Sequence, residues 1–334
     1  MLNFLFKREK NLEFELESQI LKSMCIVNNE YLLIGKLDGN LLIYEIEKNC
    51  LVYEGKMSYP INCLVTYEED STIFFACLDT PEIYLFELNI INNEFKIDLI
   101  LKYNDYHDLS VKRLKSLGNN TFASCSADSS FAIWDIEGNI LYKLKDQSHG
   151  LENFIIKIKD STISNLITLN DKGALSFYRN VNNELFLSNV ILEVDYTNSY
   201  SISEISGNKI FVGGFNSIQI YSIKSEQLIS NIKIKEPISF IFEKEKNFIV
   251  FGLKNGHLEF IDTKKLNILG EKEIKKLENK YKFSKLFQNG KIKLFKNESV
   301  INFDFFKDKL ICISDEKIRI WNCSEEQKKI FGFF

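Results

Sequence analysis

Apolar and polar residues alternate along short stretches of this chain, and the stretches return at a nearly constant interval. Seven stretches end in a large apolar side chain, and we use these side chains as anchors: Tyr44, Phe86, Trp134, Tyr178, Tyr221, Ile261 and Trp321. Successive anchors are separated by 42, 48, 44, 43, 40 and 60 residues. Alternation with a period of two predicts β-strands, and an interval of about 42 residues is typical of repeats that each form one four-stranded sheet.

The same local order precedes every anchor. An apolar run such as "TFASCS" is followed by a turn such as "ADSS", and the alternating strand comes next. Helical periodicity is weak, and the short "SEEQKKI" is its main exception. Short strands separated by Asp, Asn and Gly turns predict an all-β fold, and the fixed interval favours a seven-bladed β-propeller over a sandwich or a barrel. The prediction is one propeller domain over residues 1–334, with approximate repeats at 18–57, 58–103, 104–147, 148–193, 194–236, 237–276 and 298–334.

The third repeat carries polar residues at recognisable spacings. His107 stands four residues before Val111, Ser124 stands four before Asp128, and Asp128 stands six before Trp134. With its Trp-Asp pair, this repeat closely resembles the WD-repeat family. The resemblance implies a structural hydrogen-bond network made of His107, Ser124, Asp128 and Trp134. Such a network fixes a tight turn against the neighbouring loop and gives buried polar groups their partners.

The other repeats follow the family pattern less closely. Tyr, Phe or Ile replaces Trp at five of the seven anchors, and the preceding His is generally missing. The seventh repeat keeps Asp315 six residues before Trp321. The resemblance therefore covers nearly the whole chain by its interval, but its motifs are specific in the third repeat and partly in the seventh.

A propeller joins its last sheet to its first, because otherwise strand edges stay exposed. In the WD-repeat family the N-terminal segment usually supplies the outer strand of the last blade. Here "NLEFELES" alternates apolar and acidic residues just before the first repeat. The resemblance therefore predicts that this segment, Leu12 to Glu17, closes the propeller. The C-terminal "KKIFGFF" is an alternative for the same position.

One segment interrupts the interval before the last repeat. The gap exceeds a typical repeat by about 18 residues, and we place the insertion at 277–297. Asn289-Gly290 favours a type I′ turn between two alternating strands, so the sequence predicts an extra basic hairpin here. Its aromatic residues are Tyr281, Phe283, Phe287 and Phe295, and its lysines are Lys280, Lys282, Lys285, Lys291, Lys293 and Lys296.

Two interpretations of this basic segment remain open. Lysines interleaved with aromatic residues are typical of surfaces that bind RNA or an acidic partner. The same alternation also suits an amphipathic hairpin whose lysines are solvated and whose aromatic side chains pack on the propeller. The six lysines are therefore candidate contacts for a partner protein or for RNA.

Charge and cysteine content narrow the possible environments. The formal net charge is −4 and the pI is about 5.7, so no overall field attracts nucleic acid or an anionic membrane. The four arginines are scattered, which disfavours the Arg clusters that bind phosphopeptides. The seven cysteines include no Cys-x-x-Cys pair, which indicates a reducing compartment, either cytoplasm or nucleus. No signal peptide and no membrane span are expected.

The sequence contains few residues that could form a catalytic or metal-binding site. His149 and His257 lie in expected loops and share no context with His107. The sequence shows no metal-ligand spacing, phosphate-binding loop, dinucleotide fingerprint or serine-nucleophile motif. We therefore expect no catalytic residue, cofactor, metal or small-molecule substrate.

The resemblance implies a non-catalytic protein-interaction scaffold, a WD-repeat subunit or adaptor of a multiprotein complex. The alternative is an RNA-associated propeller factor in ribosome biogenesis, translation or RNA processing that uses the basic segment. A propeller enzyme is the least favoured of the three functions, because no catalytic motif accompanies the repeats.

Overall fold

The structure is a computed structural model of the chain. It describes residues 12–15, 21–68, 71–92, 94–104, 106–145, 149–159, 162–182, 184–192, 194–196, 202–205, 208–244, 248–262, 287–293, 300–306, 309–314 and 317–322. Strands and turns make up this part of the chain, and no helix occurs in it. Two compact units can be distinguished, one containing β2–β13 and the other containing β1 and β16–β28.

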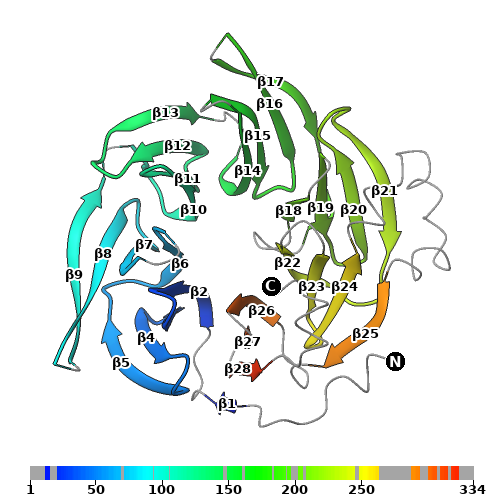
Figure 1. Cartoon of the computed structure of the whole chain (residues 1–334). Helices are drawn as coiled ribbons and strands as arrows, with labels where there is room; N and C mark the ends of the chain where they lie inside the picture. The colour runs from blue at the N-terminus through cyan, green and yellow to red at the C-terminus, as the bar shows by residue number, and fades with distance from the viewer. Residues whose placement is uncertain are drawn as a thin grey trace. The chain divides into compact units, whose positions relative to one another are not determined.

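The strands form seven four-stranded sheets, as the repeat interval predicts (Figure 1). Sheet 1 contains β2 (Leu21–Val27), β3 (Tyr31–Lys36), β4 (Asn40–Glu45) and β5 (Cys50–Lys56). Sheet 2 contains β6 (Ile61–Thr66), β7 (Ile73–Leu78), β8 (Ile83–Ile91) and β9 (Glu94–Tyr103). Sheet 3 contains β10 (Val111–Gly118), β11 (Thr121–Ser126), β12 (Ser130–Asp135) and β13 (Ile140–Lys145). Sheet 4 contains β14 (Leu151–Lys159), β15 (Thr162–Asn170), β16 (Leu175–Val181) and β17 (Glu184–Ile191).

The remaining three sheets follow in the same chain order. Sheet 5 contains β18 (Ile202–Ile205), β19 (Lys209–Gly213), β20 (Ser217–Ser222) and β21 (Gln227–Lys233). Sheet 6 contains β22 (Ile238–Lys244), β23 (Phe248–Leu253), β24 (His257–Asp262) and β25 (Phe287–Lys293). Sheet 7 contains β26 (Val300–Phe306), β27 (Lys309–Ser314), β28 (Lys317–Asn322) and β1 (Leu12–Glu15). Seven such sheets are the all-β architecture of a seven-bladed propeller.

The anchors chosen from the sequence occupy one structural position. In each of the first five sheets the pairing between the third and fourth strands shifts register immediately before the anchor, and in the sixth the shift ends at Ile261. The extra residue of each shift lies on the fourth strand, so each anchor stands opposite a β-bulge, which bends the strand that carries it. The five anchors whose side chains are described are buried: Tyr44, Phe86, Trp134, Tyr178 and Tyr221. The sequence interval thus reflects a repeated backbone feature as well as repeated hydrophobicity.

Asparagine supplies most of the left-handed turn conformations. Eight of the ten non-glycine residues with positive φ in the described part are asparagines, for example Asn28 with φ 51° and Asn208 with φ 63°. Asn tolerates this region better than most residues because its short polar side chain bonds locally to the backbone. The abundance of Asn in the sequence therefore has a structural use at the tight turns of the sheets.

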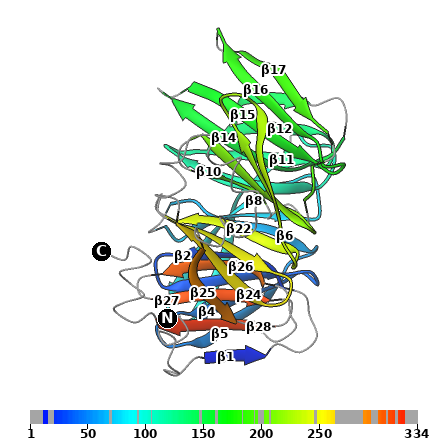
Figure 2. The same cartoon turned by 90° about the vertical axis from the view of Figure 1, so that its right-hand side faces the viewer.

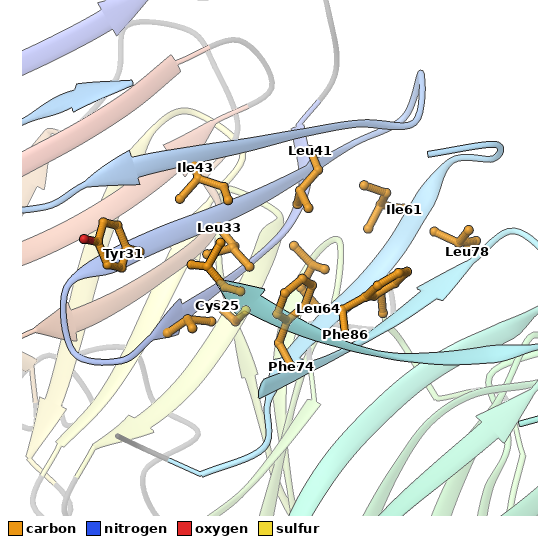
Figure 3. Close-up of a cluster of buried hydrophobic side chains, with 13 residues drawn as sticks. Cys25, Tyr31, Leu33, Leu41, Ile43, Ile61, Leu64, Phe74, Leu78 and Phe86 are labelled. Atoms are coloured by element: carbon orange, nitrogen blue, oxygen red, sulfur yellow. The ribbon is translucent and has the colours of Figure 1, made fainter. Parts of the chain in front are cut away.

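The hydrophobic core lies between successive sheets. Figure 3 shows one cluster in which side chains of sheets 1 and 2 meet. Leu33 and Ile43 come from sheet 1, Leu64 and Phe74 come from sheet 2, and all four are at least 96% buried. Because both faces of an inner strand are covered, these strands are almost continuously apolar, as in "YLLIGK" of β3. Alternation is clearer in outer strands such as "ILYKLK" of β13.

The N-terminal strand completes the seventh sheet. β1 pairs antiparallel with β28, with Leu12 opposite Ile320 and Glu15 opposite Lys317. Figure 2 shows β1 lying alongside β28. The predicted closure by the N-terminal segment is therefore confirmed for residues 12–15, while the alternative segment "KKIFGFF" lies outside the described residues.

The hairpin predicted around Asn289-Gly290 is wrong. Residues 287–293 form the single strand β25, which pairs with β24 as the fourth strand of sheet 6. The Asn289-Gly290 pair lies in the register shift between the Glu259↔Lys291 and Ile261↔Phe287 pairs. Asn-Gly favours a turn only locally, and here the two residues are accommodated by a bulge. Most of the extra length therefore lies between the third and fourth strands of sheet 6, at residues 263–286.

Candidate interaction site and the buried polar network

The third sheet contains a chain of buried polar groups. The Trp134 indole N–H donates to Ser124 Oγ at 2.8 Å, and Ser124 Oγ lies 2.7 Å from His107 Nε2. His107 Nδ1 lies 2.6 Å from Ser130 Oγ, which in turn donates to Asp128 Oδ1. Sequence reasoning left out Ser130, which stands between His107 and Asp128. Its signal was available, because Ser130 lies four residues before Trp134 at the start of the anchor strand.

The number of available protons sets the direction of these bonds. Ser130 has one hydroxyl proton, and it goes to the Asp128 carboxylate, so the bond between His107 and Ser130 uses the proton on Nδ1. A neutral imidazole then has an unprotonated Nε2, which accepts the proton of Ser124. The direct separation between His107 Nδ1 and Asp128 Oδ1 is 3.9 Å, too long for a hydrogen bond. Every member of the chain is thereby satisfied.

Asp128 also ties the turn to the preceding loop. Its carboxylate accepts the backbone N–H of Asp108 at 2.6 Å and that of Ser130 at 2.8 Å. Burial alone would raise the pKa of Asp128, but the hydrogen bonds from Ser130 and Asp108 outweigh it and hold the pKa below its usual range. The carboxylate therefore stays ionised and keeps accepting hydrogen bonds in mild acid.

Mild acid should destabilise the fold through His107. Burial lowers the pKa of His107 from 6.5 to about 4, and the Asp128 and Asp108 carboxylates oppose this effect only partly. Between these two values the unfolded chain binds a proton that the folded chain excludes, so the free energy of unfolding should decrease as pH falls through this window. The full difference corresponds to about 3 kcal/mol.

The check is urea denaturation at pH 7 and near pH 4.5, on the wild type and on His107→Gln. Between pH 7 and pH 4.5, the free energy of unfolding should decrease less in His107→Gln than in the wild type. An equal decrease in both proteins would contradict the role of His107 in the pH dependence. The lowered pKa of Asp128 acts only below the ordinary Asp range and so does not affect this window.

In sheet 5 a carboxylate also joins a tight turn to the preceding loop, but different residues form the hydrogen bonds. Asp195, in the loop before the sheet, accepts the backbone N–H groups of Phe215 at 3.0 Å and Asn216 at 3.3 Å. It also accepts the Ser217 hydroxyl at 2.8 Å. In sheet 3 the carboxylate lies in the turn and reaches the loop, whereas in sheet 5 it lies in the loop and reaches the turn. Asp195 was not predicted from the sequence, because the sheet 3 pattern places its aspartate in the turn and not in the loop before the sheet.

Gln219 and the anchor residue complete this second network. Gln219 Oε1 accepts the Tyr221 hydroxyl at 3.0 Å and the Asp195 backbone N–H at 3.1 Å. Ser217 and Tyr221 are four residues apart, as Ser130 and Trp134 are in sheet 3. A Tyr anchor is therefore compatible with a buried polar network, provided that a longer acceptor such as Gln reaches its hydroxyl.

Gly214→Ala should weaken sheet 5 because no space exists for a methyl group. A Cβ on Gly214 would fall on the Asp195 carboxylate, which hydrogen bonds hold from three sides. We expect a loss of about 1–3 kcal/mol in the free energy of unfolding. The measurement is urea denaturation of Gly214→Ala, Asp195→Ala and the double variant. In the Asp195→Ala background the carboxylate is absent, so Gly214→Ala should lower the free energy of unfolding much less. If the effects of the two substitutions are fully additive, the methyl group does not clash with the carboxylate.

The basic segment is only partly described. Lys291 and Lys293 lie on β25, opposite Glu259 and His257, while Lys280, Lys282, Lys285 and Lys296 lie outside the described residues. Asp315 of the seventh repeat is also outside them. The interpretation of the six lysines as partner contacts therefore stays a prediction.

In the described part of the chain, the other residues that could take part in catalysis or metal binding do not gather at one site. His257 Nδ1 contacts Asn255 Oδ1 at 2.9 Å, within its own turn. No group of three His, Cys, Asp or Glu side chains that could hold a metal occurs among the described residues. Six cysteines are described as free thiols, five of them buried. None of the described segments is a helix long and apolar enough to cross a membrane.

A surface made of loops and turns in sheets 1–3 exposes apolar side chains next to carboxylates. Leu37, Tyr59 and Leu109 are 41%, 50% and 53% exposed. Leu37 lies in the turn between the second and third strands of sheet 1, and the other two lie in the loops that enter sheets 2 and 3. We call these three residues, together with Asp38, Asp79 and Asp108, the loop surface.

Close contacts and hydrogen bonds fasten the turns and loops of the loop surface. A Cβ on Gly39, two residues after Leu37, would lie 2.9 Å from the Tyr59 carbonyl oxygen, so turn and loop touch. The Asp79 N–H donates to the Pro60 carbonyl at 2.9 Å. The Ser126 hydroxyl donates to the Leu109 carbonyl at 2.9 Å. The turns of the three sheets are thus fastened to the loops that carry the exposed apolar residues.

The charges of the loop surface are mostly negative. Asp38 Oδ1 accepts the Asn40 N–H at 2.9 Å, and Asp79 Oδ1 accepts the Asn62 side chain at 3.2 Å. Neither carboxylate forms a described ion pair. Asp108 pairs with Lys145 at 3.3 Å, but both side chains are well exposed, so this pair contributes little. The arrangement suits a partner that presents apolar side chains beside Lys or Arg.

Comparison with known proteins identifies the fold. No family model matches the sequence, and no curated protein has a matching sequence. Among solved structures, the chain resembles the crystal structure of Saccharomyces cerevisiae Sqt1, a WD40 propeller, with a TM-score of 0.63 and 13% sequence identity. The match covers 90% of this chain and 83% of that chain. Together with the seven sheets, this likeness shows that the chain has the fold of a seven-bladed β-propeller of the WD40 type.

Proposed function

We propose that this propeller is a non-catalytic scaffold that binds other proteins through its loop surface, as a subunit or adaptor of a multiprotein complex in the cytoplasm or nucleus. The loop surface carries the proposal. Leu37, Tyr59 and Leu109 are large apolar side chains held in contact with water by well-fastened loops, and folding gains nothing from exposing them. A fold of this kind generally presents its loops to partners.

The loop surface also favours one class of partner. Asp38 and Asp108 are chain neighbours of Leu37 and Leu109, and Asp79 is hydrogen-bonded to the loop that carries Tyr59. A partner segment that carries basic residues would therefore bring complementary charge. Apolar contacts at the centre would supply most of the affinity, while the carboxylates would mainly steer association and select against acidic segments.

The test is affinity purification of the wild type, a loop-surface variant and a control, followed by mass spectrometry with and without nuclease. The loop-surface variant is Tyr59→Ala with Leu109→Ala. The control is Leu51→Ala with Leu141→Ala, which removes side chains of similar exposure from the outer strands β5 and β13. Partners that withstand nuclease should be lost only from the loop-surface variant. Equal retention or equal loss in both variants would contradict the proposal.

A second candidate function is RNA association through the basic segment. The supporting observation is that Lys291 and Lys293 lie on β25, the outermost strand of sheet 6, in a segment with four further lysines. Phosphate neutralisation would make RNA affinity fall steeply with salt. We expect Lys282, Lys285, Lys291 and Lys293 changed together to Glu to abolish binding at low salt. If the wild type binds no RNA at low salt, this second function is excluded.

A further inference from the structure

We propose that the turn between β23 and β24 modifies itself: Asn255 converts to aspartate or isoaspartate, and His257 assists the reaction. The chain contains two Asn-Gly pairs, Asn255-Gly256 and Asn289-Gly290. A glycine after the asparagine favours this conversion, because no side chain on the second residue hinders closure of the intermediate ring. In the first pair the asparagine also has the His257 ring against its amide oxygen, at 2.9 Å. The proposal does not depend on which partner the loop surface binds.

Asn255 reacts with its own backbone in two steps. The Gly256 nitrogen attacks Cγ of Asn255 and closes a five-membered succinimide ring. The proton of that nitrogen passes through solvent to the side-chain NH2 group, whose C–N bond breaks, so that ammonia leaves. A water molecule then opens the ring at either carbonyl carbon and gives aspartate or isoaspartate. The attacking nitrogen and Cγ belong to neighbouring residues, so no second molecule has to be positioned for the first step.

Two N–H groups of His257 point at the atom on which negative charge develops. When Cγ is attacked, its oxygen, Asn255 Oδ1, becomes an oxyanion. The His257 backbone N–H donates to Oδ1 at 3.2 Å, and His257 Nδ1 lies 2.9 Å from it. An amide oxygen can only accept a hydrogen bond, so Nδ1 carries the proton. Donors that already face a developing oxyanion lower the barrier to its formation, and this is the contribution of His257.

One backbone hydrogen bond slows the first step. The Gly256 N–H donates to the Leu253 carbonyl at 3.0 Å, and this bond must open before the nitrogen can attack Cγ. Gly256 has φ 81°, and a glycine leaves this conformation more easily than any other residue. The conversion is therefore one slow event in the life of each molecule and not a turnover reaction.

Two other sheets already have an aspartate at the position of Asn255. In the corresponding turns of sheets 1 and 3, Asp38 and Asp128 accept the backbone N–H two residues later, at 2.9 Å and 2.8 Å. In all three turns the residue in between has a positive φ, from 72° to 87°. A carboxylate at position 255 would therefore accept the same backbone hydrogen bond without a change of the turn. Aspartate is thus the product that this turn accommodates, whereas isoaspartate adds a carbon to the main chain.

The experiment follows the modification of the purified full chain by mass spectrometry during prolonged incubation at neutral pH. The peptide that contains Asn255 should gain the mass difference between an amide and a carboxylic acid. His257→Phe keeps a ring but has no side-chain N–H, so it should slow the conversion at Asn255 by about tenfold or more. The matched control is His149→Phe, which replaces an exposed loop histidine and should leave the rate unchanged.

The same incubation in guanidinium chloride separates folded geometry from local sequence. In the unfolded chain the ring of residue 257 is no longer held against Oδ1, so His257→Phe should have little effect there. Circular dichroism and thermal melting establish that each variant is folded, and His257→Ala, with the same expected slowing, replaces His257→Phe if that variant is not folded. No conversion at Asn255 in the wild type overturns the proposal. Equal rates in the wild type and the residue 257 variant also overturn it, as does a slowing that is just as large in the unfolded chain.

Discussion

Trp134→Ala should lower the free energy of unfolding by about 3–5 kcal/mol. The indole is fully buried in the core between sheets 2 and 3, where it stacks on Phe122 at 6.2 Å between ring centroids and meets Tyr103 edge-on at 5.9 Å. Removing the indole leaves a cavity and also deprives Ser124 Oγ of its 2.8 Å donor. A buried hydroxyl that loses its partner adds about 1 kcal/mol or more to the loss.

Two controls separate these contributions, and all variants are compared by urea denaturation with the wild type. Trp134→Phe keeps an aromatic ring but removes the N–H, so it should cost clearly less than Trp134→Ala. Leu141→Ala removes an exposed side chain from β13 of the same sheet and should change stability by no more than about 0.5 kcal/mol. If Trp134→Ala unfolds like the wild type, the indole has no structural role in sheet 3.

Removal of residues 1–16 should produce the second large effect. The truncation takes β1 out of sheet 7 and leaves β28 as an unpaired edge, although Ile318 and Ile320 on β28 are buried. Each backbone hydrogen bond lost between β1 and β28 should cost about 1 kcal/mol, and the exposed edge should promote aggregation. Four residues of each strand are paired, from Leu12↔Ile320 to Glu15↔Lys317.

Truncation after residue 10 retains β1 and provides the control. Thermal unfolding and light scattering of the two truncated proteins measure stability and aggregation together. If both proteins equal the full chain, β1 does not close the fold, and "KKIFGFF" becomes the candidate for the outer position of sheet 7.

The repeat organisation could be predicted from the sequence because its signals are local. Alternation with period two arises within each strand, and the large apolar residue before each turn recurs opposite the bulge of the fourth strand. Tyr44 and Trp134 differ in chemistry but both lie opposite this bulge, and both are buried. The interval survives substitution because filling that position requires only size and hydrophobicity.

The basic segment shows where local signals fail. Asn289-Gly290 is a strong local signal for a hairpin turn, but sheet 6 lacks an outer strand until residues 287–293 supply one. The unpaired edge of β24 is a tertiary requirement that a sequence window around residue 289 does not contain. Pairing with this edge satisfies backbone groups along the whole strand, which outweighs the preference of two residues for a turn.

The polar networks were predictable in part. His107, Ser124, Asp128 and Trp134 stand at spacings that pointed to the third sheet, and the structure places their side chains in one chain of contacts. Ser130 joins that chain because the 3.9 Å between His107 and Asp128 is too long for a direct bond, and only coordinates reveal such a gap.

Taken alone, the sequence determined the strand content, the number of repeats and the N-terminal segment that completes the last sheet, because alternation and interval are written into each repeat. The tertiary structure decided which side chains remain in contact with water. Leu187 on β17 and Leu33 on β3 are both leucines in apolar runs, yet Leu187 is 56% exposed and Leu33 is fully buried. Their difference depends on whether another sheet covers the strand, and that is a relation between residues far apart in the chain.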